Sequence, residues 1–231
     1  MSKTFLSIGS GPGIGLATAR RFAAEGYDIV LSSRNPAALQ QHAEALRATG
    51  VGVTIKQVDT SNAQQVAALA GAISDGGELV LHYNTAVLVF QPDGILVPQP
   101  IETQSTEMLT STMQINLSSA LVAIQSALPG MKRHGKGSIL ITGGGVALRP
   151  RADQLTLSVS KAGLRSMTQA LFEPLSADNI HIATVTVNQL IGADSQDSRD
   201  IAELFWKLHA QAKTDWTWEE WFGARIAPAT N

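Results

Sequence analysis

The segment that decides the fold reads Gly9-Ser10-Gly11-Pro12-Gly13-Ile14-Gly15. It follows a short apolar run at 5–8 and opens a segment with helical spacing at 13–25. Glycines between a strand and a helix let the backbone adopt positive φ and approach a pyrophosphate closely, and the helix N-terminus offers unpaired N–H groups. The segment therefore predicts a dinucleotide-binding turn, and the alternative is a structural turn whose glycines only permit tight packing.

Short β-rich runs alternate with longer helix-like segments along the chain. The expected strands are at 5–8, 29–31, 51–58, 79–81, 139–142 and 182–187, and the expected helices at 13–25, 36–49, 62–73, 107–133 and 154–175. Such alternation predicts βαβ units with right-handed crossovers. We therefore expect one α/β domain over residues 1–231, with a doubly wound parallel sheet of the Rossmann type.

The composition argues against several classes of protein. Lys and Arg number 17 against 19 Asp and Glu, without a basic cluster, so no nucleic-acid partner is expected. No apolar run is long enough to span a bilayer, and the lack of cysteine is compatible with a reducing compartment, so we expect a cytoplasmic protein with no membrane partner. The five histidines are isolated and no Gly-x-Ser-x-Gly elbow occurs, which argues against a metal site and a hydrolase.

The residues after the second expected strand bear on the choice of nicotinamide cofactor. In NAD-binding versions of this fold an acidic residue here bonds the ribose 2′-hydroxyl and repels a 2′-phosphate. This chain instead has Ser33 and Arg34, and the planar guanidinium of arginine suits a phosphate. The sequence predicts NADP(H), against the alternative that Arg34 is an ordinary exposed residue.

The glycine spacing, with three residues between Gly9 and Gly13 and one between Gly13 and Gly15, resembles that of short-chain dehydrogenases/reductases. The resemblance extends to about Val187, and it implies that Asp59 and Thr60 lie at the adenine, with a helix N-cap at Asp59 as the alternative. The expected cofactor contacts are Gly9, Gly11, Gly13, Ile14, Gly15, Ser33, Arg34, Asp59, Thr60, Asn84 and Lys161.

The catalytic segment departs from the family pattern. The family's reacting pair is Tyr-x-x-x-Lys, and here Leu157 stands in place of the tyrosine while Lys161 is kept. Gly144 takes the place of the family's serine, and Asn116 resembles the helix asparagine that helps hold a relay water. A phenol beside an ammonium group can exchange a proton near neutrality, whereas a leucine cannot. The pattern separates cofactor binding from acid–base chemistry.

Two nearby groups are candidates to replace the missing proton donor. Tyr83 is expected at the carboxyl end of the fourth strand, where ligands bind in open α/β sheets. Lys161 is the other candidate, because burial lowers the pKa of a lysine. With Asn116 they form the expected catalytic set; weaker options are His82, Arg149, Ser158 and Ser160. A reaction that needs no proton from the protein, such as reduction of an activated double bond, is an alternative.

The expected function is an NADP(H)-dependent oxidoreductase with an altered or missing proton donor. The alternative from a different class is a catalytically silent NADP(H)-binding regulatory or partner protein. A methyltransferase with a similar glycine-rich turn is a third possibility, which Ser33 and Arg34 disfavour because that chemistry usually needs an acid at this place. The resemblance also implies a homodimer or homotetramer formed through the long helices that carry Asn116 and Lys161.

All four tryptophans lie near the end of the chain, at Trp206, Trp216, Trp218 and Trp221. Apolar residues at helical spacing from Ile201 to Leu208 predict a helix there. We expect a C-terminal helix and tail over about 195–231 on the substrate side, with the later tryptophans in a seventh, edge strand or capping the pocket. A tail that lines the pocket would favour a small apolar or aromatic substrate.

Overall fold

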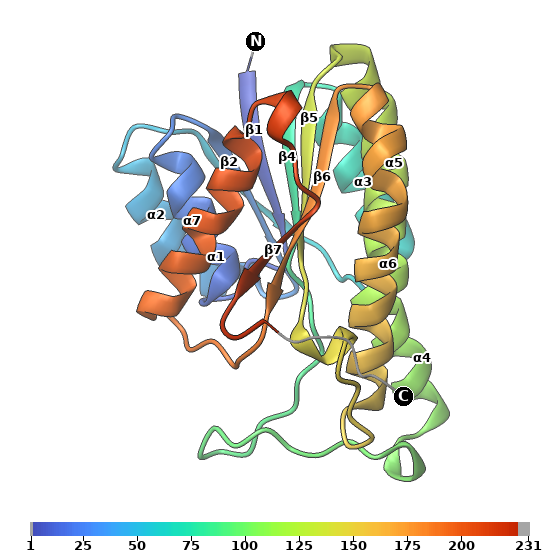
Figure 1. Cartoon of the computed structure of the whole chain (residues 1–231). Helices are drawn as coiled ribbons and strands as arrows, with labels where there is room; N and C mark the ends of the chain where they lie inside the picture. Colours follow the sequence, from blue (N-terminus) through green and yellow to red (C-terminus); the bar gives the residue numbers. More distant parts are fainter. Residues whose placement is uncertain (1, 226–231) are drawn as a thin grey trace.

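The computed structural model describes residues 2–225, which form one sheet of seven parallel strands between two layers of helices (Figure 1). The strand order is β3-β2-β1-β4-β5-β6-β7. The strands are β1 (Ser2–Ile8), β2 (Asp28–Ser33), β3 (Val53–Gln57), β4 (Gly77–Tyr83), β5 (Gly137–Thr142), β6 (Ile180–Val187) and β7 (Glu219–Phe222). The predicted doubly wound parallel sheet is thus confirmed.

The strands are apolar because helices cover both faces of the sheet. Side chains alternate between the faces, so Leu81 and Tyr83 of β4 pack on one side and His82 on the other. The face with Leu81 is covered by α3 (Ala63–Ser74), α5 (Ser119–His134) and α6 (Leu155–Ala177). The opposite face is covered by α1 (Ile14–Ala23), α2 (Gln40–Arg47) and α7 (Gln196–Ala210). This alternation decides which residues of a strand can reach the site.

The long helix expected at 107–133 is interrupted. It consists of α4 (Thr106–Met113), a π-helical turn (Gln114–Ser118) and α5. A π-turn shifts the backbone hydrogen bonds by one residue and frees a carbonyl for another partner. The expected helix at 36–49 likewise begins as a 3₁₀ turn at Pro36–Leu39, before α2. Both departures are local changes of hydrogen bonding that leave the layer arrangement intact.

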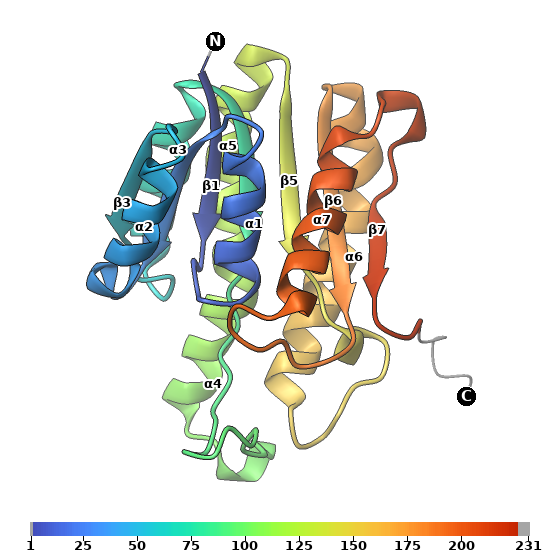
Figure 2. The same cartoon turned by 90° about the vertical axis from the view of Figure 1, so that its left-hand side faces the viewer.

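The C-terminal region provides the predicted seventh strand. β7 lies parallel to β6 at one edge of the sheet, and β3 forms the other edge (Figure 2). The expected helix around 201–208 is α7, which packs on α1 through Trp206 and Phe22. Among the described residues, no helix combines the length and the apolar character needed to cross a bilayer.

Candidate functional site

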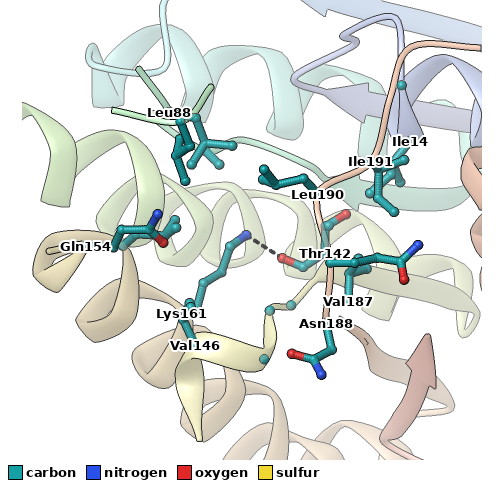
Figure 3. Close-up of a pocket in the computed structure, with 18 of the residues that line it drawn as sticks. Ile14, Leu88, Thr142, Val146, Gln154, Lys161, Val187, Asn188, Leu190 and Ile191 are labelled. Carbon is teal, nitrogen blue, oxygen red and sulfur yellow. Dashed lines mark hydrogen bonds between the residues drawn. The ribbon is translucent and has the colours of Figure 1, made fainter. Parts of the chain in front are cut away.

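A cavity of about 770 Å³ runs along the carboxyl ends of the central strands. It is bounded by the glycine-rich turn after β1, by the segments after β4, β5 and β6, and by the start of α6. Figure 3 shows the Lys161 side chain extending from α6 to Thr142, with Leu88, Gln154 and Leu190 around the cavity. This is the edge at which open α/β sheets bind their ligands.

The glycine-rich turn is shaped by steric limits on its own backbone. Gly9 has a φ of +89°, and a Cβ there would lie 2.9 Å from the carbonyl oxygen of Asn84. A Cβ on Gly15 would lie 2.7 Å from the carbonyl oxygen of Gly9, so neither position accepts a side chain without movement of the backbone. The residues of the turn that line the cavity are Gly11, Gly13 and Ile14.

Helix α1 starts at this turn, and the first of its N–H groups to donate to a backbone carbonyl is that of Leu16, which donates to Gly11 at 3.1 Å. It has no side-chain cap and no acidic residue in its first turn. The partial positive charge of the helix N-terminus is therefore not neutralised by the chain itself. Such an end can hold a phosphate group, as the sequence predicts.

A chain of hydrogen bonds connects the glycine-rich turn to β5. The Asn84 side-chain amide donates to the carbonyl oxygen of Gly9 at 3.0 Å, and the Thr142 hydroxyl donates to Asn84 Oδ1 at 2.8 Å. His82 Nε2 lies 3.1 Å from the same hydroxyl oxygen. Because that hydroxyl gives its proton to Asn84, His82 must donate through Nε2. The four residues together hold the turn against the ends of β4 and β5.

His82 is part of this chain and does not line the cavity. Its side chain is fully buried between the rings of Phe5 and Phe205. Burial lowers the pKa of His82 to about 3, with a contribution from the charge of Lys161. The imidazole is therefore neutral at ordinary pH, and the weaker option that His82 supplies a proton is not supported.

Lys161 is the predicted site residue that lies deepest in the cavity wall. Its side chain is only 6% exposed, and Nζ donates to the carbonyl oxygen of Thr142 at 2.7 Å. Burial lowers the pKa of Lys161 to about 8. Its aliphatic stem passes Gly144, where an added Cβ would lie 3.3 Å from Lys161 Cγ. Leu157, one turn earlier on α6, presents an apolar side chain to the same cavity.

The structure corrects the expectation for Tyr83. Its side chain is 1% exposed and points into the core between the sheet and α5, because alternation along β4 sends it away from the cavity. The hydroxyl donates to the carbonyl oxygen of Ile115 at 2.5 Å, and burial raises the pKa of Tyr83 to about 12. A phenol so placed cannot supply a proton to a substrate, so Tyr83 is not a proton donor.

Asn116 lies in the π-helical turn, fully buried beside the cavity wall. Its Oδ1 accepts a hydrogen bond of 2.8 Å from the backbone N–H of Val87. Its Nδ2 finds no acceptor in the part of the chain that the structure describes. Asn116 thus fixes the backbone that follows β4, and one polar group remains to be satisfied next to the site.

A second hollow of about 430 Å³ adjoins the ends of β2 and β3 and is lined by Arg34, Gln57, Asp59 and Gln65. Arg34 is exposed, and within residues 2–225 no carboxylate lies within ion-pair distance of it. Ser33 precedes it at the end of β2, and the Ser33 hydroxyl accepts a hydrogen bond from the backbone N–H of Asn35. The hollow therefore offers an unpaired guanidinium where the sequence predicts a 2′-phosphate.

Asp59 and Thr60 have local roles in the chain. The Asp59 carboxylate accepts hydrogen bonds from the backbone and hydroxyl of Ser61, which hold the pKa of Asp59 below its ordinary value. The N-cap of α3 is Asn62, so the alternative that Asp59 is the cap is wrong. The carbonyl oxygen of Thr60 accepts a hydrogen bond of 2.6 Å from the hydroxyl of Ser119. Of Asp59 and Thr60, only Asp59 lines the hollow that Arg34 also lines.

The C-terminal region does not cover the cavity as expected. The lining residues extend from Gly11 to Ile191, so none of residues 195–225 lines it, and 226–231 lie outside the described residues. Trp206 packs edge-on against Phe22, and Trp216 stacks on His181 with ring centroids 4.6 Å apart. Trp218 lies beneath the guanidinium of Arg165. These rings stabilise the sheet edge and its helices by packing.

Comparisons with known proteins agree with this architecture. A family model described as short chain dehydrogenase matches residues 3–198. The chain is 28% identical over 169 residues to 2,5-dichloro-2,5-cyclohexadiene-1,4-diol dehydrogenase of Sphingobium indicum, which covers 73% of this chain and 65% of that protein. It is 30% identical over 183 residues to dehydrogenase/reductase SDR family member 4 of Homo sapiens, covering 78% and 63%. The matched part is thus less than two thirds of either relative.

Solved structures show the same fold over nearly the whole chain. A short-chain dehydrogenase from Rhodopseudomonas palustris superposes with a TM-score of 0.84 at 25% identity, covering 96% of this chain and 99% of the other. A metagenomic short-chain oxidoreductase in complex with NADP superposes with a TM-score of 0.82 at 22% identity, covering 99% and 98%. By the match over residues 3–198, this chain belongs to the short-chain dehydrogenase family.

Proposed function

We propose that this chain is an NADP(H)-dependent oxidoreductase whose proton donor differs from the tyrosine of its family. The observation that carries the proposal is the cavity of about 770 Å³ that is continuous from the glycine-rich turn to Lys161. The turn and the open start of α1 suit a pyrophosphate, and Lys161 lies at the far end. When bound, the nicotinamide cofactor supplies or accepts a hydride.

The choice of NADP(H) over NAD(H) rests on the hollow beside Arg34. The guanidinium has no carboxylate partner among the described residues, and Ser33 stands where an acid would repel a phosphate. The Asp59 carboxylate in the same hollow is already held by Ser61. A charge-assisted pair between guanidinium and phosphate would favour the 2′-phosphorylated cofactor.

Lys161 is the proposed source of the proton. Its ammonium group, with a pKa of about 8, is mostly charged near neutrality and can still release a proton to an oxygen in the cavity. Leu157 and Gly144 offer no hydroxyl, and Tyr83 is buried in the core. Lys161 would thus hydrogen-bond and protonate the oxygen of a carbonyl substrate while Thr142 holds the lysine in place.

A second function is favoured by the same two substitutions. With Leu157 and Gly144 at these positions, the chain lacks both hydroxyl groups that would orient and protonate a carbonyl. A protein that binds NADP(H) without turning over a substrate is expected to lack the same groups.

The discriminating experiment has two parts. Fluorescence titration compares NADPH with NADH, and a screen of carbonyl compounds and enones follows NADPH consumption. NADPH preference with turnover supports the oxidoreductase, and NADPH preference without turnover supports the regulatory protein. Equal affinity for the two cofactors, or binding of neither, contradicts both functions.

Assembly through α5 and α6 and a cytoplasmic location are further predictions. Leu121 of α5 and Val159 of α6 are exposed apolar residues on these helices, with 47% and 48% of their surface accessible. Burial of such residues between copies would stabilise a homodimer or homotetramer. Light scattering of the purified protein measures its mass in solution and tests this assembly.

A further inference from the structure

The part of the cavity beyond Lys161 is lined mainly by apolar and positively charged residues. The ends of β2, β1, β4 and β5 follow one another along the sheet edge, and they carry in turn Arg34, the glycine-rich turn, Asn84 and Thr142. Under the proposed function the cofactor occupies this line. The substrate then faces the remaining wall, which is formed by the segment after β4, by the turn after β5 and by the first residues of α6.

Most of that wall is apolar and held in place by backbone hydrogen bonds. Its apolar members are Leu88, Leu96, Ala86, Val146 and Leu157. The first two belong to a hairpin in which the Val97 N–H donates to Val89 and Phe90 bridges to Leu96. The Gln99 N–H also donates to the carbonyl oxygen of Asp153 at 2.6 Å, which ties the end of the hairpin segment to the loop before α6. A fixed apolar wall suits an apolar substrate.

The charged groups of the wall are all positive. Among the described lining residues there is no Asp or Glu, and the cations are Arg149, Arg151 and Lys161. Arg151 is neutralised by Asp153 through hydrogen bonds of 2.9 and 2.6 Å, and Lys161 is bound to Thr142. For Arg149 no carboxylate within residues 2–225 lies at ion-pair distance. Its charge is therefore available to a ligand.

The backbone places Arg149 at a fixed point of the wall. It follows the 3₁₀ turn at Gly145–Ala147, and its N–H donates to the carbonyl oxygen of Gly145 at 3.1 Å. Under the proposed function, Arg34 and the glycine-rich turn bind the phosphates of the cofactor at the other end of this row of strand ends. Arg149 is an exposed residue that lines the cavity, and its guanidinium, without a carboxylate partner among residues 2–225, fits a second, smaller anion.

We propose that the substrate is an apolar carbonyl compound that also carries a carboxylate, and that Arg149 binds this carboxylate. The inference rests on the proposed function, because it takes the cofactor to fill the other end of the cavity. A guanidinium binds a planar carboxylate through two parallel hydrogen bonds, whereas an ester or amide of the same shape loses the charge-assisted part of that interaction. The apolar wall contacts the rest of the molecule.

The experiment measures binding of benzoylformate and of its methyl ester by calorimetry, with and without saturating NADP⁺, the oxidised cofactor, which cannot reduce the ketone during the titration. The wild-type protein is expected to bind the acid at least about tenfold more tightly than the ester, a ratio that corresponds to about 1.4 kcal/mol. Arg149→Gln should abolish this preference, because it should weaken binding of the acid and leave binding of the ester unchanged. Arg133→Gln, which removes one charge on α5 at the opposite edge of the sheet, should retain it.

The outcomes separate the inference from the proposed function. Equal affinity of the wild-type protein for acid and ester, absence of binding of both, or an unchanged acid affinity in Arg149→Gln each overturns the inference. NADPH affinity, measured in parallel, tests the proposed function and shows that Arg149→Gln is folded. If NADPH does not bind but the acid binds through Arg149, the proposed function fails and the anion site stands.

Discussion

Lys161 and Thr142 are joined by a hydrogen bond of 2.7 Å from the lysine Nζ to the threonine carbonyl oxygen. The hydroxyl of the same threonine donates to Asn84, which in turn donates to Gly9. One residue at the end of β5 thus positions both the cationic group of the cavity and the glycine-rich turn. Lys161 thus has an anchor in the chain itself, and Leu157 stands four residues before it, where the resemblance predicts a tyrosine.

The first prediction concerns Lys161 and pH. If its ammonium group supplies the proton, kcat/KM for carbonyl reduction should fall as the pH rises through about 8, because the group then loses its charge. Lys161→Met should lower kcat/KM by about 10²-fold or more. Steady-state rates between pH 6.5 and 9.5 check this, at saturating NADPH. If Lys161→Met loses activity but kcat/KM of the wild-type protein does not change with pH, another group donates the proton.

The second prediction concerns cofactor selectivity. Arg34→Gln should weaken NADPH about tenfold or more and leave NADH nearly unchanged, since one charge-assisted hydrogen bond contributes about 1.5–3 kcal/mol. Fluorescence titration of both cofactors measures the two affinities. Arg133→Gln is the control, because it removes an exposed arginine charge, paired with Asp75, that does not line the hollow. A parallel loss of NADPH and NADH affinity would instead indicate a general effect on folding.

The third prediction concerns Tyr83. Tyr83→Phe should leave kcat/KM and NADPH affinity unchanged, because the hydroxyl points into the core. The free energy of unfolding should fall by about 1 kcal/mol or less, since the Thr85 hydroxyl continues to donate to the same carbonyl oxygen of Ile115. Urea denaturation and steady-state kinetics test the two halves. A tenfold loss of kcat with unchanged stability would show that the Tyr83 hydroxyl contributes to catalysis.

The fourth prediction concerns acid. Burial lowers the pKa of His82 to about 3 and that of His209 to about 4, and it also lowers the pKa of His181. The unfolded chain, with histidine pKa values near 6.5, therefore binds more protons below that pH than the folded chain. Stability should fall as the pH decreases from about 6.5 towards 4, by up to about 1.4 kcal/mol per pH unit for each such histidine.

Thermal unfolding at pH 7.5, 6 and 4.5 measures this dependence. His209→Gln should show a shallower loss of Tm with acid than the wild type, whatever its absolute Tm, because one of the buried neutral groups no longer titrates. An equal slope in the two proteins would show that carboxylates, and not the histidines, govern acid unfolding.

The fifth prediction restores the missing hydroxyls. Leu157→Tyr places a phenol four residues before Lys161 on the same helix face, and Gly144→Ser adds a side chain whose Cβ meets only the flexible stem of Lys161 at 3.3 Å. If the chain is the silent NADP(H)-binding protein, the double variant should raise carbonyl reduction by about 10²–10⁴-fold, the usual contribution of general acid–base catalysis; if Lys161 already donates the proton, the gain should be smaller. NADPH consumption is the measurement, and Leu157→Phe with Gly144→Ser is the control of equal bulk. Equal rates in the two would contradict a hydroxyl deficit.

The fold was predictable because it depends on local patterns. The apolar runs, their alternation with helical segments and the turn from Gly9 to Gly15 each follow from spacing along the chain. Element ends were less well predicted, because hydrogen bonding outside the segment sets them. The π-turn around Asn116 is an example: the hydroxyls of Tyr83 and Thr85, some 30 residues away in sequence, bind the carbonyl of Ile115 that this turn leaves free.

The site was predictable in its backbone parts and much less so in its side chains. The turn, Lys161 and the cavity positions of Leu157 and Gly144 agree with the sequence motifs. The links through Thr142 and His82 were missed, since nothing in the sequence shows that two strand ends will lie 3.1 Å apart at these atoms. A hydrophilic histidine within the apolar run of β4 was the one available signal.

The sequence by itself determined the doubly wound sheet and the glycine-rich turn after its first strand, because these depend on residue types at fixed spacing. It also has Leu157 and Gly144 at the places where the resemblance predicts a tyrosine and a serine. Only the tertiary structure decided that Tyr83 faces the core and that Trp206, Trp216 and Trp218 pack away from the cavity. It also decided that Arg149 has no carboxylate at ion-pair distance among residues 2–225. Those outcomes depend on which face of each element is buried and on which side chains meet across the sheet. Such contacts are set by packing between distant segments.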